Sequence, residues 1–288
     1  MADSMNLPPL RIAEILWRYG LRPDRQLGQN FLVDEAALRR VTFAAEITPI
    51  DAVLEIGPGL GSLTRHLALA AQRVVAVELD ERLLPALRET LQGASNVEIV
   101  AGDILQVDPA ALMAQDSYLV VANIPYYITS AVFRHLLAVR PRPRRIVLTV
   151  QREVAQRICA APGEMNLLAL GVQLYGEPSV AAHIPAGAFL PVPKVDSAVV
   201  RVDVTPQPRL AQQDVPLFFQ LAKAAFAQKR KTLANTLSAG LRWSKAEAQA
   251  RLAAAGIAPN TRPQALDWDA WARLVAVCKA DGALNGRL

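Results

Sequence analysis

The chain contains little cysteine and no apolar run long enough to cross a membrane. Its 288 residues include only Cys159 and Cys278, which lie far apart and match neither a zinc-binding spacing nor a disulfide framework. No apolar run approaches the roughly 18 residues of a membrane helix, and the N-terminal stretch MADSMNLPPL lacks the basic and apolar regions of a secretion signal. We therefore expect a soluble, monomeric protein of the reducing cytoplasm, with no metal site.

The apolar residues occur in short runs that alternate with segments of helical period. Such alternation predicts an α/β, Rossmann-like fold, in which a mostly parallel sheet is covered by helices on both faces. Two later runs, 168–184 and 197–204, read as further strands that add antiparallel pairing at one edge. The expected parallel strands are VLEIG (53–57), RVVAVELD (73–80), NVEIVAGD (96–103), SYLVVANIP (117–125) and RIVLTVQ (145–151).

The pattern changes near Thr205, where TPQPRLAQQDVP contains three prolines and is typical of a linker. Everything beyond it has helical period, and Ser244 with Glu247 forms a capping-box signature at a helix start. We expect one domain over 1–204 and a small helical domain over 205–288. The helical segment carries 12 Lys+Arg and 5 Asp+Glu, a net charge of +7, whereas residues 1–204 are net −2.

Basic residues gather in two parts of the chain, one in each expected domain. Seven arginines between 134 and 157 surround the turn before RIVLTVQ, and Gln228-Lys229-Arg230-Lys231 is the densest run of the helical domain. A run of charge on a helix is usually only a solvated face, but two basic regions that could face a common groove favour a polyanionic partner. We expect RNA contacts from Arg144, Arg145, Lys194, Lys229, Arg230 and Lys231.

A glycine cluster, Glu55-Ile56-Gly57-Pro58-Gly59-Leu60-Gly61, lies between an apolar strand and a helix. Glycines at this position permit a tight turn and a close approach to a ligand. Glu78 ends the next strand, where its carboxylate could accept both hydroxyls of a ribose, and Asp103 ends the following one, where it could accept from an adenine amine. A dinucleotide and S-adenosylmethionine both fit. The spacing G-x-G-x-G, rather than G-x-G-x-x-G, favours the methyl donor.

The stretch VANIPYYITS (121–130) follows another buried strand at the same expected sheet edge. Methyl transfer to an aromatic amine requires the nitrogen lone pair to localise, and hydrogen-bond acceptors aimed at the amine hydrogens assist this. Asn123 offers a side-chain carbonyl, and Ile124 or Pro125 offers a main-chain carbonyl. Tyr126 supplies a ring on which an extruded base can stack. In the alternative interpretation, Asn123 forms a turn and the tyrosines pack at a rim.

These motifs together resemble those of the rRNA adenine N6,N6-dimethyltransferases. The resemblance covers Gln29-Asn30-Phe31-Leu32, the glycine loop, Glu78, Asp103, Asn-Ile-Pro-Tyr at 123–126, and FLPVPKVDS at 189–197. AFAQKRKTL at 225–233 is similar to the C-terminal domain of the small-subunit, KsgA-type branch. Met165 and Asn166 depart from the family, which usually has a Tyr-Gly pair there, and Ile124 replaces its usual leucine.

The resemblance implies a function and a set of site residues. It implies dimethylation, from S-adenosylmethionine, of two adjacent adenosines in a hairpin near the 3′ end of small-subunit rRNA, as part of ribosome biogenesis. Phe189 is implied to help sandwich the target base, beside Asn123, Pro125 and Tyr126 in the catalytic set. The residues implied or expected to contact the methyl donor are Asn30, Leu32, Gly57, Gly59, Glu78, Asp103, Ile104 and Asn123.

Three alternatives remain open from the sequence. A large-subunit rRNA methyltransferase of the macrolide-resistance type would share the motifs up to Ser197, although QKRKTLANTL favours the small-subunit branch. A non-catalytic RNA-binding assembly factor could share the fold, although the intact Asn-Ile-Pro-Tyr motif argues against it. A dinucleotide oxidoreductase is disfavoured by the glycine spacing.

Overall fold

The computed structural model describes residues 7–228 and 230–281, and it divides into two units. Unit 1 consists of residues 1–156 and 177–204, and unit 2 of residues 157–176 and 205–288. The expected division at Thr205 therefore coincides with one change of unit, while residues 157–176 group with the C-terminal helices. Whether each unit is a domain that folds independently stays a prediction.

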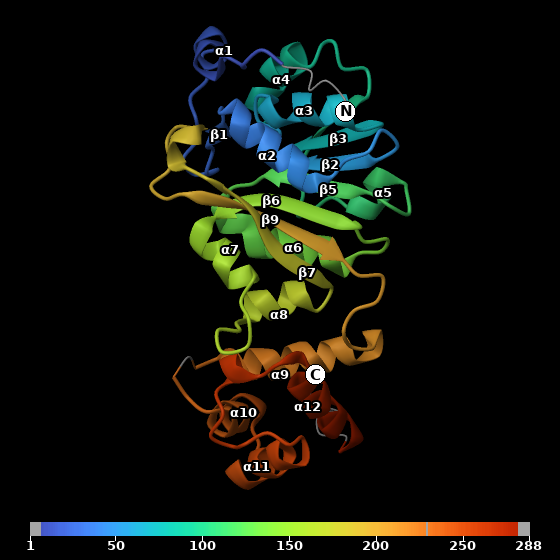
Figure 1. The fold of residues 1–288 in the computed structure, drawn as a ribbon, viewed down its shortest axis with the longest axis vertical. Coiled ribbons are helices and arrows are strands. Elements are labelled where there is room, and N and C mark those ends of the chain that lie inside the picture. The colour runs from blue at the N-terminus through green and yellow to red at the C-terminus, as the bar shows by residue number, and fades with distance from the viewer. Residues whose placement is uncertain (1–6, 229, 282–288) are drawn as a thin grey trace. The chain divides into compact units, whose positions relative to one another are not determined.

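Unit 1 is built on a seven-stranded sheet with the order β4-β3-β2-β5-β6-β9-β7 (Figure 1). The first five strands in this order are parallel, and β9 pairs antiparallel with β6. A separate two-stranded sheet joins β1 and β8. The strands are β1 (Phe31–Leu32), β2 (Ala52–Ile56), β3 (Arg73–Glu78), β4 (Val97–Ala101), β5 (Leu119–Asn123), β6 (Arg145–Gln151), β7 (Gly176–Ile184), β8 (Phe189–Leu190) and β9 (Ser197–Val204).

The expected Rossmann-like sheet with an antiparallel edge is confirmed by this order. The chain order reverses between β2 and β5, and the carboxyl ends of strands at such a point form the usual ligand crevice of open α/β sheets. The helices around the sheet are α1 (Ile12–Arg18), α2 (Glu35–Ala45), α3 (Ser62–Ala70), α4 (Leu84–Thr90), α5 (Pro109–Met113), α6 (Thr129–Ala138) and α7 (Arg152–Ile158), whose last residues belong to unit 2.

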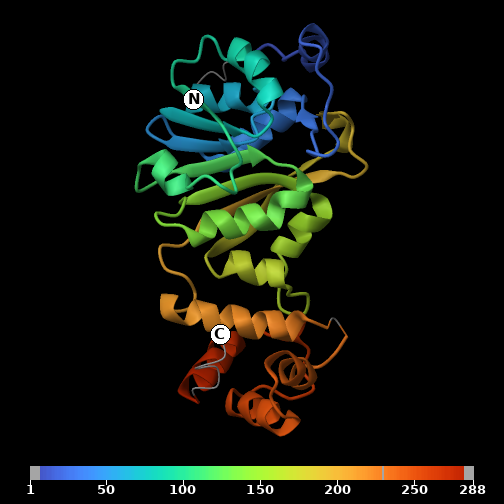
Figure 2. The same cartoon turned by 180° about the vertical axis from the view of Figure 1, so that it is seen from behind.

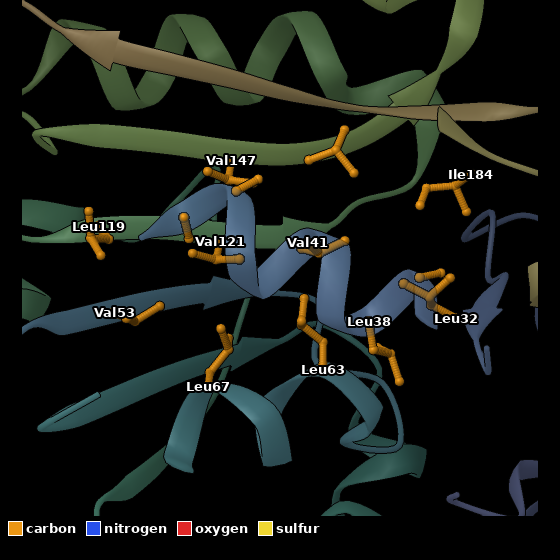
Figure 3. Close-up of a cluster of buried hydrophobic side chains, with 14 of the residues drawn as sticks. Leu32, Leu38, Val41, Val53, Leu63, Leu67, Leu119, Val121, Val147 and Ile184 are labelled. Carbon is orange, nitrogen blue, oxygen red and sulfur yellow. The ribbon is translucent and has the colours of Figure 1, made fainter. Parts of the chain in front are cut away.

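Helices α2 and α3 cover one face of the sheet, and α6 lies on the opposite face (Figures 1 and 2). Figure 3 shows Leu38 and Val41 of α2 in one buried cluster with Leu63 of α3 and Val121 of β5. Burying each such side chain contributes about 1.5–3 kcal/mol. Apart from Glu55 near the end of β2 and Asn123 at the end of β5, the residues of these two strands are apolar, because helices cover both faces of the sheet.

Unit 2 contains the C-terminal helices. Its core includes Phe218 and Trp271, whose rings pack edge to face with centroids 5.6 Å apart. The capping box is present, since Ser244 Oγ accepts from the Glu247 N–H and Glu247 Oε2 accepts from the Ser244 N–H. The helices are α8 (Leu167–Gln173), α9 (Val215–Phe226), α10 (Leu233–Leu241), α11 (Lys245–Ala254) and α12 (Trp268–Ala280).

The strand expected over 168–184 is wrong in its first part. Residues Leu167–Gln173 form α8, and the strand begins only at Gly176. Asn166, one of the two residues that depart from the related family, caps this helix because its Oδ1 accepts from the Ala169 N–H at 3.0 Å. Its Nδ2 also donates to the Arg157 carbonyl at 2.8 Å, so Asn166 has a structural role within unit 2.

No helix in residues 7–228 and 230–281 has the length and apolar character needed to span a bilayer.

Candidate functional site

A cavity of about 270 Å³ opens at the carboxyl ends of β2, β3 and β5, within unit 1. Its walls come from the loop before β1, the glycine loop after β2, and the segments that follow β3, β4 and β5. The structure brings together at this cavity all the residues predicted to bind the donor and three of the four predicted catalytic residues, with Asn123 in both sets: Asn30, Leu32, Gly57, Gly59, Glu78, Asp103, Ile104, Asn123, Pro125 and Tyr126.

The glycine loop is held against the end of β3 by Glu78. Glu78 Oε2 accepts from the Gly59 N–H at 2.9 Å, and Oε1 accepts from the Asp80 N–H at 2.8 Å. Gly59 has φ +59°, and a Cβ there would lie 2.9 Å from the Phe31 ring, so no other residue fits without displacing that ring. The carboxylate therefore fixes the loop and keeps its remaining lone pairs for a ligand.

Asn123 is oriented by the loop that precedes β1. Its Nδ2 donates to the Asn30 carbonyl at 3.0 Å, and Asn30 Nδ2 in turn donates to the Gly28 carbonyl at 3.0 Å. Because the amide nitrogen of Asn123 is engaged in this way, its Oδ1 is the atom left to accept hydrogen bonds from a ligand. The sequence predicted an acceptor here, and the network indicates how its orientation is fixed.

The turn after Asn123 presents Tyr126 at the cavity. The tyrosine begins a 3₁₀ turn, Tyr126–Ile128, and its hydroxyl lies 2.7 Å from Ser197 Oγ on β9. Burial raises the pKa of this hydroxyl, although its hydrogen bond with Ser197 acts in the opposite direction. The Pro125 carbonyl already accepts from the Ile128 N–H at 3.2 Å, so Ile124 offers the less engaged of the two main-chain acceptors considered from the sequence.

Phe189 is not among the residues that line the cavity. It pairs with Leu32 where β8 meets β1, it is 2% exposed, and it belongs to the buried cluster shown in Figure 3. Stacking of Phe189 on a target base therefore requires its ring to be uncovered first. That role stays a prediction. No local pattern indicated the burial of Phe189, because an isolated aromatic residue is common both in cores and at sites.

The cavity is acidic. The described residues that line it include Glu55, Glu78 and Asp103 but no Lys, Arg or His. Burial is the largest cause that raises the pKa of Glu78, and the nearby Asp80 carboxylate raises it further. Although α3 begins at Ser62 beside the cavity, three carboxyl groups without a basic side chain suit a ligand with net positive charge better than one with a pyrophosphate, which cationic side chains usually help to bind.

The space at the glycine loop also fits an elongated ligand. A Cβ added at Gly57, where φ is +68°, would meet no atom within 4 Å, so the cavity reaches the bare backbone at this point. Glu78 is the last residue of β3, and Asp103 lies just beyond the end of the neighbouring strand β4. These positions are suited to contacts with a ribose and a base, respectively. The residues present therefore fit S-adenosylmethionine.

The residues predicted to bind RNA are scattered. Arg144 and Arg145 lie at the amino end of β6, the opposite end from the cavity, and both are paired. Arg144 Nη2 lies 2.8 Å from Asp51 Oδ2, and Arg145 Nε donates to Asp203 Oδ1 at 2.6 Å. Nothing in this arrangement supports a direct RNA contact by these two arginines, and their ion pairs account for them as parts of unit 1.

Three further predicted RNA-binding residues are exposed. Lys194 lies on the segment between β8 and β9, and Arg230 and Lys231 lie between α9 and α10. The basic run was expected on a helix, but its described residues lie between helices, where the Lys231 N–H donates to the Gln228 carbonyl at 3.2 Å. Lys229 lies outside the described residues. RNA binding by this run stays a prediction.

Glu55 and Tyr127 are among the cavity residues that were not predicted as site residues from the sequence. Glu55 is 1% exposed and lines the cavity from β2, and Tyr127 lines it while 64% exposed. An acidic residue at the end of an otherwise apolar strand, as in VLEIG, is a usable signal because burial of a carboxyl group is rare without a purpose. The second tyrosine carried no such signal.

Residues 21–279 match the model of the family described as "Ribosomal RNA adenine dimethylase". The chain belongs to this family. It is therefore a methyltransferase of the class that modifies adenine in ribosomal RNA, as the motifs indicated.

Curated relatives of this family agree over most of the chain. "Ribosomal RNA small subunit methyltransferase A" of Dehalococcoides mccartyi (strain CBDB1) is 43% identical over 263 residues, which is 91% of this chain and 90% of the relative. The protein with the same name from Moorella thermoacetica is 42% identical over 283 residues, 94% of this chain and 98% of its own length.

Two solved structures share the fold. A dimethyladenosine transferase from Plasmodium falciparum has a TM-score of 0.73 and 26% identity, covering 88% of this chain and 98% of its own. The 23S rRNA methyltransferase ErmE has a TM-score of 0.70 and 30% identity, covering 87% of this chain and 100% of its own. The fold is thus shared with an enzyme whose name specifies 23S rRNA.

Proposed function

We propose that the protein transfers methyl groups from S-adenosylmethionine to N6 of two adjacent adenosines in a 3′-terminal hairpin of small-subunit rRNA. The product is N6,N6-dimethyladenosine, formed in the cytoplasm during ribosome biogenesis. The observation that carries the proposal is a single cavity in which acidic residues and no basic ones meet the oriented Asn123. A cationic donor and an aromatic amine are the two ligands that such a cavity accommodates together.

The donor supplies an electrophilic methyl group on its sulfonium, and the protein positions and polarises the acceptor. Glu78 accepts the ribose hydroxyls and Asp103 the adenine amine of the donor, while Gly57 and Gly59 let the backbone approach it. Asn30, Leu32 and Ile104 complete its binding site. These assignments rest on the placement of all the residues around one cavity.

Asn123 and Ile124 hold the target amine. Asn123 Oδ1 and the Ile124 carbonyl accept its two hydrogens, which directs the nitrogen lone pair towards the donor and stabilises the positive charge that grows on nitrogen. Tyr126, fixed by its bond to Ser197, supports the extruded base. The amine proton leaves to solvent after transfer, since the nitrogen becomes acidic once it carries the methyl group.

Small-subunit rRNA is the favoured substrate for two reasons. The curated relatives that share 42–43% identity over at least 91% of this chain are named as small-subunit enzymes. In addition, the segment QKRKTLANTL resembles the C-terminal domain of that branch. The likeness to ErmE, at 30% identity, keeps large-subunit rRNA as the second candidate.

Transfer of labelled methyl groups into isolated small and large ribosomal subunits tests the proposal. We expect incorporation into the small subunit, and digestion should give N6,N6-dimethyladenosine at two adjacent positions. Labelling of the large subunit alone would support the second candidate. Saturable donor binding without transfer to either subunit would contradict the enzymatic assignment and favour a non-catalytic RNA-binding factor.

A further inference from the structure

Glu55 is a buried carboxyl group to which the proposed mechanism gives no role. It lies near the carboxyl end of β2, it is 1% exposed, and it lines the donor cavity. Its Oε2 has no hydrogen-bond partner among the described residues. A carboxylate in this state would be costly, because a buried charge needs either a counter-charge or several hydrogen bonds.

The neighbours of Glu55 supply no counter-charge. Alternate residues of a strand share a face, so Glu55 lies on the same face of β2 as Val53, which packs against α3. Thr64 of α3 is the polar neighbour of Glu55 there. The charged residue that acts on it is Glu78 of β3, which repels a negative charge. The other titratable residues around the cavity are Asp103, Tyr126 and Tyr127, none of them basic.

The two carboxyl groups differ in their support. Glu78 accepts two main-chain N–H bonds, which stabilise its ionised form. Glu55 has no main-chain bonds of this kind. Burial is the largest cause that raises its pKa to about 8; hydrogen bonding with Thr64 acts in the opposite direction, and repulsion from Glu78 adds to the rise. When two nearby carboxyls compete, the less supported one keeps its proton. At pH 7 Glu55 therefore favours its protonated form when no cation lies opposite it.

We propose that Glu55 recognises the sulfonium charge of the methyl donor, losing its proton when the donor binds and thereby favouring the donor over the uncharged thioether product. The proposal rests on the proposed function, since it takes S-adenosylmethionine as the ligand. When the donor binds, the carboxyl group of Glu55 loses its proton to the buffer and becomes a carboxylate. The positive charge on the sulfonium of the donor then balances the negative charge of the carboxylate.

This arrangement distinguishes donor from product by charge. S-adenosylmethionine and S-adenosylhomocysteine share the nucleoside and the amino-acid portion, so Glu78, Asp103 and the glycine loop contact both alike. They differ by one methyl group and one positive charge at sulfur. A carboxyl group that ionises only opposite that charge strengthens binding before transfer and weakens it afterwards, which assists product release. Glu55 is thus a positioning and specificity residue for the donor.

Calorimetric titration of both ligands, in buffers with different ionisation enthalpies, measures the protons released. At pH 7 we expect close to one proton released per S-adenosylmethionine bound by the parent protein, because a group of pKa about 8 is then mostly protonated. Much less should be released with S-adenosylhomocysteine. Between pH 6 and 7.5 the association constant for the donor should rise by roughly tenfold per pH unit.

Glu55→Gln keeps the shape of the side chain and removes its proton, and Glu81→Gln, an exposed carboxyl near the cavity, is the matched control. The amino group of the donor itself contributes equally to the proton release measured with the parent and with each variant. The difference in proton release between parent and variant therefore measures the contribution of Glu55. We expect Glu55→Gln to abolish the release and flatten the pH dependence, with Glu81→Gln unchanged.

The parent protein alone can overturn the inference, even if Glu55→Gln does not fold. Donor binding without proton release would contradict it while leaving the proposed function intact. Equal release with donor and product would also contradict it, since Glu55 would then respond to a charge that both ligands share. A failure to bind S-adenosylmethionine at all would instead refute the proposed function.

Discussion

The donor cavity and the C-terminal basic turn use charge in different ways. At the cavity, Glu78 is 5% exposed, its carboxylate is bonded to the glycine loop, and Asn123 is held by Asn30. In the turn, Arg230 and Lys231 are exposed and surrounded by solvent. Buried groups act over short distances in a low dielectric, whereas exposed charges act weakly and are screened by salt. Substitutions at the cavity should therefore have large and specific effects, and those in the turn small and general ones.

The largest effect is expected for Asn123→Ala. Loss of one preorganised electrostatic contact typically lowers a rate by about 10²–10³, so single-turnover methyl transfer should fall by that factor at saturating donor. RNA binding and the fold should be almost unchanged. Asn260→Ala, an exposed asparagine, serves as the control. Transfer at near-parental rate by a folded Asn123→Ala protein would remove this residue from the mechanism.

Glu78→Ala should act on the donor and not on the RNA. It removes an acceptor for two ribose hydroxyls, and a charge-assisted hydrogen bond is worth about 1.5–3 kcal/mol, so donor affinity should fall at least tenfold. Calorimetry of S-adenosylmethionine binding measures this. Parental affinity in the variant would show that the ribose is bound elsewhere, and weakened RNA binding would show that the two regions are not separate in function.

Neutralising Lys229, Arg230 and Lys231 together should weaken RNA binding for all sequences alike. The slope of log affinity against log salt should fall by about one for each lost phosphate contact, with donor affinity hardly changed. The measurement is RNA binding at several salt concentrations.

The control for this turn is a second set of three exposed basic residues in unit 2, changed in the same way: Lys223, Arg242 and Lys245. An equal fall in slope for the two sets would mean that only total charge matters. An unchanged slope in the first set would mean that the basic turn does not contact phosphate.

The smallest effect is expected for Arg144→Gln, with exposed Arg134→Gln as control. Burial acts to raise the pKa of Asp51, but hydrogen bonds from Arg144 and Thr48 lower it overall. A lowered folded-state pKa means that the pair stabilises above the unfolded value near 4 and that this contribution is lost as pH falls through the folded value. Denaturation at pH 7 should show a loss of about 1 kcal/mol or less. A marked loss of RNA affinity would instead restore Arg144 as an RNA contact.

The parallel strands and the donor site were accessible from sequence because their signals are local. Each strand is a continuous apolar run, and the glycines, Glu78, Asp103 and Asn123 follow strand ends, which meet at one edge of a parallel sheet. The family motifs then identified the chemistry. The error at 168–184 arose because a short apolar run fits a buried helix as well as a strand, and Asn166 as a helix cap was overlooked.

The sequence by itself determined the alternation of strands and helices, the glycine loop and the excess of basic residues after Thr205. Only the tertiary structure decided which charges are free. It pairs Arg144 and Arg145 with carboxylates, covers Phe189, and leaves Glu55 buried without a counter-charge among the described residues that line the cavity. The physical reason is that burial and pairing depend on residues distant in the chain, such as Asp51 and Asp203, whose approach no local pattern specifies.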